Sequence, residues 1–231
     1  MDDGSSSVQE SIKMLRLSRR GGIKSIAATP HFYAQHESPE HFLSRRSEAW
    51  KRLSQALPED VPAVSLGAEV YYYTGISNTE DLSELCIGES RILLLEMPFR
   101  RWTERMTDEM VELAQGSGLT VLLAHIDRYL TAQPPDTWEK LAGKGVLFQM
   151  NASAFLESRL FRRKVLRLVE DGEITVLGSD CHNMKNRKPN LDEAFAVIRR
   201  KLGEETVRSM VEEADRLFAG CRTEEKYTRG M

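Results

Sequence analysis

The stretch LTVLLAH, residues 119–125, is an apolar run that ends in a histidine. Similar runs at residues 92–96 (ILLLE) and 174–180 (ITVLGSD) each end in a carboxylate. Helical patterns separate these runs along the chain. Uninterrupted apolar strands between helices are typical of a parallel sheet that helices cover on both faces. The pattern therefore predicts an α/β fold.

The alternation extends over most of the chain. Six strands are predicted, at residues 23–29, 64–72, 92–96, 119–125, 146–151 and 174–179. Helices are predicted at residues 5–20, 39–57, 102–116, 137–142, 161–170, 190–202 and 204–218. Six strands are one or two short of a closed β/α barrel. The length of 231 residues suits one such domain, which we expect over residues 1–220, with a polar tail at residues 221–231.

Composition excludes several classes of function. The 32 Lys and Arg residues nearly balance 35 Asp and Glu residues, so no basic surface for nucleic acid or membrane is indicated. No apolar run reaches the length of a membrane span, and membrane insertion is not expected. The three cysteines are odd in number and widely spaced, which favours a reducing cytoplasm over a disulfide framework. The sequence leaves homo-oligomer formation open.

Candidate metal ligands gather at the carboxyl ends of the predicted strands. In parallel α/β folds these ends face the active site. Each such residue alone is more simply a hydrogen-bonded structural residue, but three histidines and three acids share this placement. Mixed histidine and carboxylate ligands suit Mn, Fe or Zn, and bridged ions of this kind activate water and neutralise a phosphoryl group. The residues are His31, Glu69, Glu96, His125, Asp180 and His182.

Two arginines lie just beyond these positions. Arg128 follows His125, and Arg187 follows His182. Most arginines are simply solvated, but a guanidinium beside candidate ligands can bind phosphate through two parallel hydrogen bonds. The sequence therefore predicts a metal-dependent phosphoesterase.

A second phosphatase signature overlaps this region. Cys181 and Arg187 match C-x5-R, the short motif of cysteine-based tyrosine phosphatases. Those enzymes cradle phosphate with backbone N–H groups around a thiolate of low pKa. The loop CHNMKNR contains no glycine, and the preceding Asp180 opposes a thiolate. We therefore interpret Cys181 as structural.

Several ordered motifs resemble the polymerase and histidinol phosphatase (PHP) superfamily, and most closely its bacterial capsule-type tyrosine phosphatases, the CpsB/CapC group. The matching pieces are DDGSSSVQES, AATPHF, LGAEVYY, LLLEMPF, LLAHIDRY and LGSDCHNMKNRKP, between Asp2 and Pro189. The resemblance implies a distorted seven-stranded β/α barrel of the TIM-like kind that carries up to three divalent ions, with manganese expected.

The same resemblance assigns roles to residues. One ion site would comprise Glu69, Glu96 and His125. A second would comprise Asp3, His31 and His182, and a third would use Asp180 and Glu69. Arg128 and Arg187 would hold the phosphate. The implied reaction is attack of metal-bound hydroxide on phosphotyrosine, with the tyrosine-rich tail of a bacterial capsule or exopolysaccharide tyrosine kinase as substrate.

One departure from the family pattern concerns the start of the chain. Members of the group begin with a short strand carrying an HxH motif, whereas here Met1 is followed directly by Asp2. We expect the first barrel strand to be missing, the third ion to be weakened, and the chain to be a truncated or mis-started product. Two alternatives stay open: a PHP phosphoesterase for histidinol phosphate or nucleotides, and a non-catalytic remnant.

Overall fold

A computed structural model describes residues 2–219; the predicted tail at residues 221–231 lies outside them. Its strands are β1 (Ser25–Ala28), β2 (His31–Phe32), β3 (Ala63–Leu66), β4 (Glu69–Tyr71), β5 (Ile92–Glu96), β6 (Thr120–Leu123), β7 (Leu147–Asn151) and β8 (Val176–Gly178). Its helices are α1 (Val8–Arg20), α2 (Pro39–Ser54), α3 (Glu104–Gly116), α4 (Pro135–Ala142), α5 (Arg159–Glu170), α6 (Leu191–Leu202) and α7 (Glu204–Leu217).

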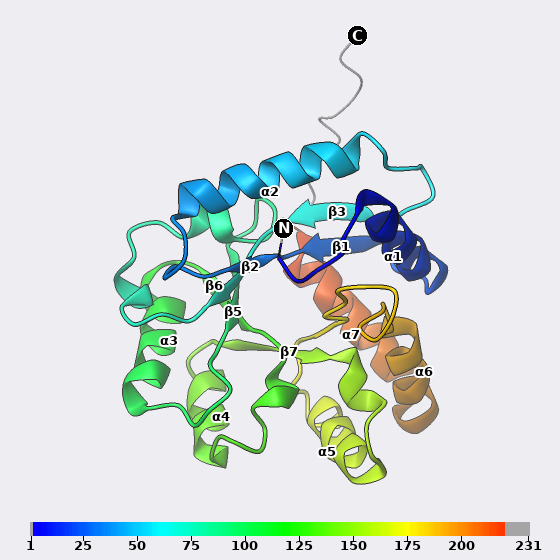
Figure 1. Cartoon of the computed structure of the whole chain (residues 1–231). Helices are drawn as coiled ribbons and strands as arrows, with labels where there is room; N and C mark the ends of the chain where they lie inside the picture. The colour runs from blue at the N-terminus through cyan, green and yellow to red at the C-terminus, as the bar shows by residue number, and fades with distance from the viewer. Residues whose placement is uncertain (1, 220–231) are drawn as a thin grey trace.

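The strands form a curled parallel sheet with the helices around its outside (Figure 1). Six strands are hydrogen-bonded in the order β2-β4-β5-β6-β7-β8, and β1 pairs separately with β3. Every pairing is parallel, so the carboxyl ends of the strands meet at one mouth. The predicted α/β class is thus confirmed as an open half-barrel with seven helices in the described part of the chain.

The strand predicted at residues 64–72 is divided into β3 and β4, whereas the strand predicted at residues 23–29 forms β1 and is followed by the short strand β2. Pro30, which has no backbone N–H to donate to a neighbouring strand, lies between β1 and β2. Carbonyl groups still accept hydrogen bonds across this interruption: Ala28 O accepts one from Gly67 N–H at 2.9 Å, and Pro30 O accepts one from Glu69 N–H at 3.0 Å. The register therefore continues, and it places His31 directly beside Glu69.

Strand β5 shows what lies beneath the mouth. Neighbouring residues of a strand face opposite sides, and both sides of β5 are buried. Leu93 and Leu95 pack in the large core under the helices. Ile92 and Leu94 belong to a smaller apolar cluster with Leu122 and Val176, which face them from β6 and β8. Glu96 ends the face of β5 that carries this smaller cluster.

The predicted burial of both sheet faces is wrong for the strands at one edge. In β1, Ser25 and Ala27 are exposed. Among the described strands β1 pairs only with β3, so it is an edge strand.

No helix of the described chain is both long enough and apolar enough to cross a membrane.

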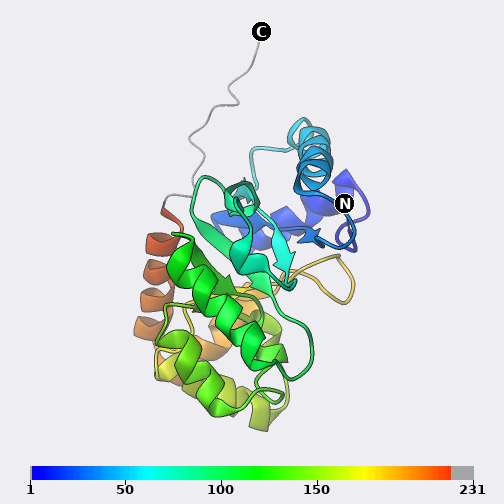
Figure 2. The ribbon, with the colours of Figure 1, turned by 90° about the vertical axis from the view of Figure 1, so that its left-hand side faces the viewer.

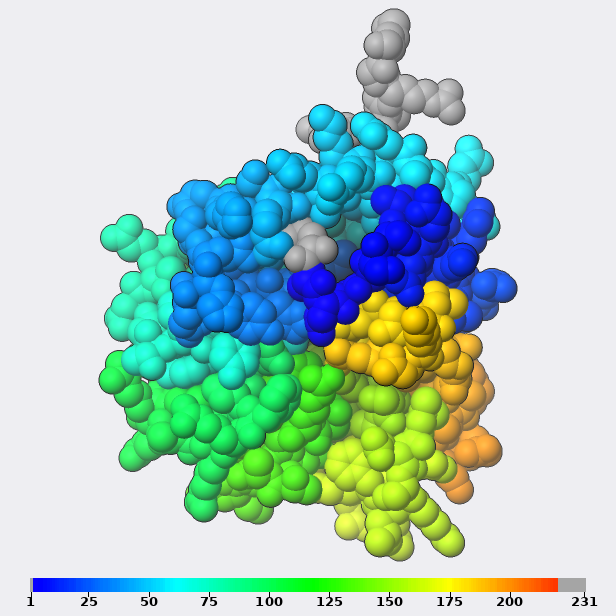
Figure 3. Space-filling view, viewed as in Figure 1, coloured from blue at the N-terminus to red at the C-terminus, as the bar shows by residue number. Residues whose placement is uncertain are grey.

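The N-terminal segment lies on the side of the sheet where the strands end (Figure 2). Helix α1 begins after Ser7, whose hydroxyl accepts a hydrogen bond from the backbone N–H of Glu10. Glu10 in turn accepts a hydrogen bond at 3.3 Å from the backbone N–H of Met184, in the loop after β8. In the space-filling view the two segments lie against each other (Figure 3). This contact brings Asp2 and Asp3 to the ends of the strands.

Candidate metal and phosphate site

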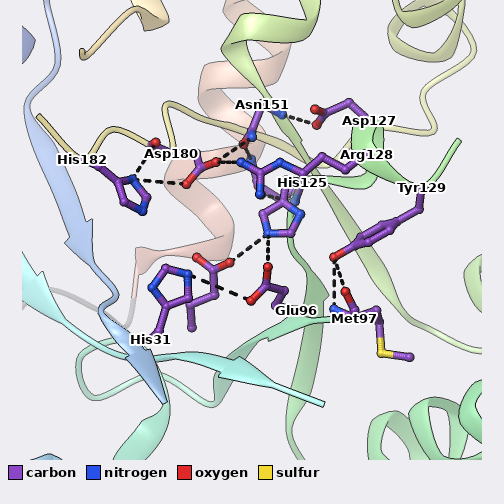
Figure 4. Close-up of polar contacts among 12 residues, drawn as sticks. His31, Glu96, Met97, His125, Asp127, Arg128, Tyr129, Asn151, Asp180 and His182 are labelled. Atoms are coloured by element: carbon purple, nitrogen blue, oxygen red, sulfur yellow. Dashed lines mark hydrogen bonds and ion pairs between the residues drawn. The ribbon is translucent and has the colours of Figure 1, made fainter. Parts of the chain in front are cut away.

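Three predicted ligands from β4, β5 and the end of β6 meet around one imidazole nitrogen (Figure 4). His125 Nε2 lies 2.8 Å from Glu69 Oε1 and 3.4 Å from Glu96 Oε1. All three residues are buried. Burying two carboxylates is costly without compensating positive charge. His125 Nδ1 is also buried and has no hydrogen-bond partner among the described residues, so only Nε2 is engaged.

A second group forms where the N-terminal segment meets β2 and the loop after β8. Asp3 Oδ1 lies 3.4 Å from His31 Nδ1 and 3.3 Å from His182 Nε2. The other nitrogen of His31, Nε2, lies 4.0 Å from Glu96 Oε2. His31 therefore stands between the two groups, and its potential ligand atoms lie within 4.8 Å of those of Asp3 and His182 and of those of Glu69 and Glu96.

Without a metal ion, protonated histidines balance the negative charge of the carboxylates, as a bound cation would. Hydrogen bonding to Asp2 is the main cause that raises the pKa of His31 to about 9, with Glu69 and Glu96 adding to it. Burial alone would lower the pKa of His125, but hydrogen bonds to Glu69 and Glu96 raise it to about 9. The site therefore favours positive charge on both imidazoles, at positions that face carboxylates.

Asp2 belongs to this arrangement, although the sequence analysis did not select it. Its Oδ2 accepts hydrogen bonds from the backbone N–H of His31 at 2.9 Å and pairs with His31 Nδ1 at 3.1 Å. Burial alone would raise the pKa of Asp2, but these hydrogen bonds lower it below its usual range. The only signal in the sequence is the adjacent pair of acids, which does not show which carboxylate faces His31.

Asp180 belongs to neither group of potential ligands, but its Oδ1 lies 3.6 Å from Nδ1 of His182, a member of the second group. Its Oδ1 accepts a hydrogen bond from Arg187 Nη2 at 2.7 Å, and its Oδ2 is paired with Arg128 Nη2. Burial would raise the pKa of Asp180, but the two guanidinium groups lower it. The two predicted phosphate-binding arginines thus converge, and the anion between them is a carboxylate of the chain.

His125 and Asp180 share an uncommon backbone conformation. They are the non-glycine residues with positive φ in the described chain, at 33° and 48°. Such conformations cost free energy and persist where the surrounding structure imposes them. Two buried amides of β7, Gln149 and Asn151, connect the two residues by hydrogen bonds. Neither amide was among the functional residues predicted from the sequence.

The cysteine-based alternative finds no support at Cys181. Burial, the largest cause, raises the pKa of this thiol, and the charge of Asp180 raises it further. A reactive cysteine requires the opposite shift. Arg187, the other residue of the C-x5-R motif, is bound to Asp180.

Comparison with known proteins places this site in a family. The model of the CpsB/CapC capsular polysaccharide synthesis family matches residues 1–218. The chain belongs to the CpsB/CapC family.

Relatives in this family are named as tyrosine phosphatases. Tyrosine-protein phosphatase YwqE of Bacillus subtilis (strain 168) is 29% identical over 227 residues, which cover 94% of this chain and 87% of YwqE. Tyrosine-protein phosphatase CpsB of Streptococcus agalactiae serotype III (strain NEM316) is 26% identical over 216 residues, covering 89% of this chain and 88% of CpsB.

A solved structure shares the fold. It comes from crystallographic work on YwqE of Bacillus subtilis and CpsB of Streptococcus pneumoniae, described there as metal-dependent tyrosine phosphatases. Its chain is 26% identical to this one, with a TM-score of 0.81, and the match covers 96% of this chain and 91% of that chain. The CpsB/CapC fold therefore extends over nearly the whole molecule.

The residues at the mouth fit a divalent cation of this family. Imidazole nitrogens and carboxylate oxygens lie within 4.8 Å of one another in two groups that share His31. This donor set suits Mn, Fe or Zn. His125 Nε2 and Glu69 Oε1 lie 2.8 Å apart, and both are atoms that would bind a cation in place of their hydrogen bond.

Proposed function

We propose that this protein is a metal-dependent protein tyrosine phosphatase of capsule or exopolysaccharide synthesis. One observation carries the proposal: two groups of potential metal ligands lie beside two arginines that already hold an anionic group. The named activity of the family relatives supports the same reaction.

The ligand roles divide by position. Glu69, Glu96 and His125 are proposed for one ion, and Asp3, His31 and His182 for a second. Asp180 is proposed as a catalytic residue and a ligand of a third ion together with Glu69, which requires it to exchange its arginine partners for cations. Bound divalent ions, manganese in the first instance and iron or zinc otherwise, would supply an activated water and neutralise phosphate charge.

Arg128 and Arg187 are proposed to bind the phosphate. A phosphate presents oxygens to a guanidinium much as a carboxylate does. The two arginines therefore have the arrangement needed to exchange Asp180 for a phosphate group. This exchange would hold the ester at the mouth and release the Asp180 carboxylate in the same step.

The wider setting is also a proposal. We infer a single domain over residues 1–220 and a distorted seven-stranded β/α barrel, with the described strands in six positions and a seventh position between β8 and β1. The proposed partner is the phosphotyrosine-bearing tail of a bacterial tyrosine kinase, and the proposed location is the cytoplasm.

Hydrolysis of a phosphotyrosine peptide and of 4-nitrophenyl phosphate, with added Mn²⁺ and then with chelator, tests the proposal. We expect activity that requires the metal and is abolished by His125→Ala. The matched control is His41→Ala, because His41 is exposed and pairs with Glu37 outside the site. Activity that survives chelation, or that both variants lose equally, would refute a metal centre at His125. Preference for a phosphomonoester other than phosphotyrosine would instead favour another PHP phosphoesterase.

A further inference from the structure

An exposed aromatic ring stands beside the buried ligands of the site. Phe99 follows β5 by three residues and is 58% exposed, although every residue from Ile92 to Pro98 is buried. Single exposed apolar residues are common on protein surfaces, so exposure alone assigns no role to Phe99. Its contacts do, because they connect the ring to both halves of the proposed site.

Phe99 touches the groups proposed to bind metal and phosphate. The Cζ atom of Arg128 lies over the ring, 5.5 Å from its centroid. The ring centroid of Phe99 is 5.9 Å from that of His125. The guanidinium of Arg128 therefore makes two contacts: its Nη2 pairs with Asp180, and its Cζ lies over the ring of Phe99. A phosphate held by Arg128 in place of Asp180 would have Phe99 at its side.

The ring is held firmly despite its exposure. Phe99 stacks on Tyr129 with the ring centroids 5.6 Å apart and the planes inclined by 23°. The Tyr129 hydroxyl donates a hydrogen bond to Met97 O at 2.8 Å and accepts one from Met97 N–H at 3.1 Å. Trp102 packs edge-on against Tyr129 at 5.1 Å. A ring fixed in this way can bind a ligand with little loss of side-chain entropy.

Two more aromatic side chains lie at the ends of the neighbouring strands. Tyr33 directly follows β2, and Tyr71 ends β4. Their ring centroids lie 5.4 Å apart, and Tyr33 stacks on His31 at 5.7 Å. Three adjacent strand ends therefore place an aromatic ring near the potential ligands.

We propose that Phe99 is a specificity residue that packs against the aryl group of the ester and so selects aryl over alkyl phosphates. This inference rests on the proposed function and names the part of the substrate that lies next to the phosphate. In an aryl phosphate a single oxygen joins the ring to phosphorus. The ring must therefore lie in contact with whatever surrounds the phosphate, and at Arg128 that neighbour is Phe99.

If Phe99 had a structural role alone, it would orient Arg128 and make no contact with the substrate. That role affects every phosphate ligand equally, because each would bind the same guanidinium. The aryl role affects only ligands that have a ring. Inorganic phosphate, a competing ligand without a ring, separates the two.

The test compares the Mn²⁺-loaded wild type with Phe99→Leu, which keeps an apolar side chain and removes the ring. We expect KM for phosphotyrosine to rise about five- to tenfold, the size of one lost aromatic pair. We expect kcat and the inhibition constant of inorganic phosphate to change by less than about twofold. The matched control is Leu160→Ala on α5, which removes an apolar side chain that is 81% exposed and should change none of the three.

Each result decides between the readings. An unchanged KM, or a KM and an inhibition constant that rise together, would overturn the aryl role of Phe99 in an otherwise active enzyme. A wild-type protein that hydrolyses no phosphate ester with any divalent metal would overturn the proposed function, and this inference with it.

Discussion

The side-chain oxygen Oε1 of Gln149 accepts a hydrogen bond from the backbone N–H of His125 at 2.5 Å. Gln149 Nε2 donates to Asn151 Oδ1 at 3.0 Å, and Asn151 Nδ2 donates to Asp180 Oδ2 at 3.0 Å. Gln149 and Asn151 are two residues apart in β7, so they share one face of the sheet. Strand β7 supplies none of the proposed ligands, yet its two amides fix the two residues with positive φ.

Loss of the hydrogen bonds made by Gln149 should mainly lower the affinity for metal and have a smaller effect on the stability of the fold. We expect Gln149→Leu to lower Mn²⁺ affinity by about 10- to 100-fold, the usual effect of removing a partner that orients ligands. Titration calorimetry with Mn²⁺ measures the change. The control is Gln133→Leu, which removes another buried glutamine. Gln133 accepts a hydrogen bond from the backbone N–H of Trp102 and donates one to the backbone carbonyl of Arg100. Equal Mn²⁺ affinities in the wild type and Gln149→Leu would contradict the role of β7.

The space around Gln149 requires a glycine on the neighbouring strand. A Cβ atom at Gly178 would lie 2.5 Å from Gln149 Nε2, and this amide is held by its two hydrogen bonds. We expect Gly178→Ala to lower the free energy of unfolding by about 1–3 kcal/mol, as is usual for overpacking. Urea unfolding measures this change. Combining it with Gln149→Ala should restore part of the stability without restoring activity, whereas a fully stable and active Gly178→Ala protein would refute the clash.

Removal of the thiol should leave most of the activity intact. The pKa of Cys181 is raised by burial, so the thiolate is scarce at neutral pH. We expect Cys181→Ser to change kcat/KM by less than about threefold, and thiol alkylation to be harmless where chelation is not. A folded but inactive Cys181→Ser protein would support the cysteine mechanism instead.

Metal binding should release protons near neutral pH. The pKa values of His31 and His125 are raised to about 9 in the metal-free protein, so both imidazoles carry protons at pH 7.5. Their protonation stabilises the metal-free fold fully below their ordinary pKa of about 6.5, and that contribution is lost as pH rises through about 9. Cations need the deprotonated nitrogens, so apparent affinity should rise between pH 7 and 9.

Calorimetry in two buffers of different ionisation enthalpy counts these protons. We expect one to two protons to be released for each protein molecule loaded with Mn²⁺ at pH 7.5, about the number carried by the two imidazoles. The His41→Ala control should release the same number. Release of no protons would show that neither imidazole becomes a ligand.

The sequence predicted which strand ends carry the site because a charged residue after an apolar run is visible locally. Glu96 and His125 are of this kind, and the structure brings their side chains together. The interruption at Pro30 was also visible in principle, since proline cannot donate within a sheet. Its consequence, the alignment of His31 with Glu69, depends on strand register, which the local sequence does not encode.

The partners of Asp180 and the role of β7 depend on contacts between distant segments. Arg128 and Asp180 are 52 residues apart in the sequence and are paired in the folded chain. Gln149 and Asn151 did carry a signal, because two amides on one face of a buried strand need partners. The identity of those partners, His125 and Asp180, required the three-dimensional arrangement.

The most direct test is a crystal structure of the Mn²⁺-loaded protein with anomalous scattering recorded at the manganese edge. The account predicts one ion bound by Glu69, Glu96 and His125, and a second bound by Asp3, His31 and His182. Ordered crystals that show no anomalous peak within bonding distance of these six side chains would contradict it.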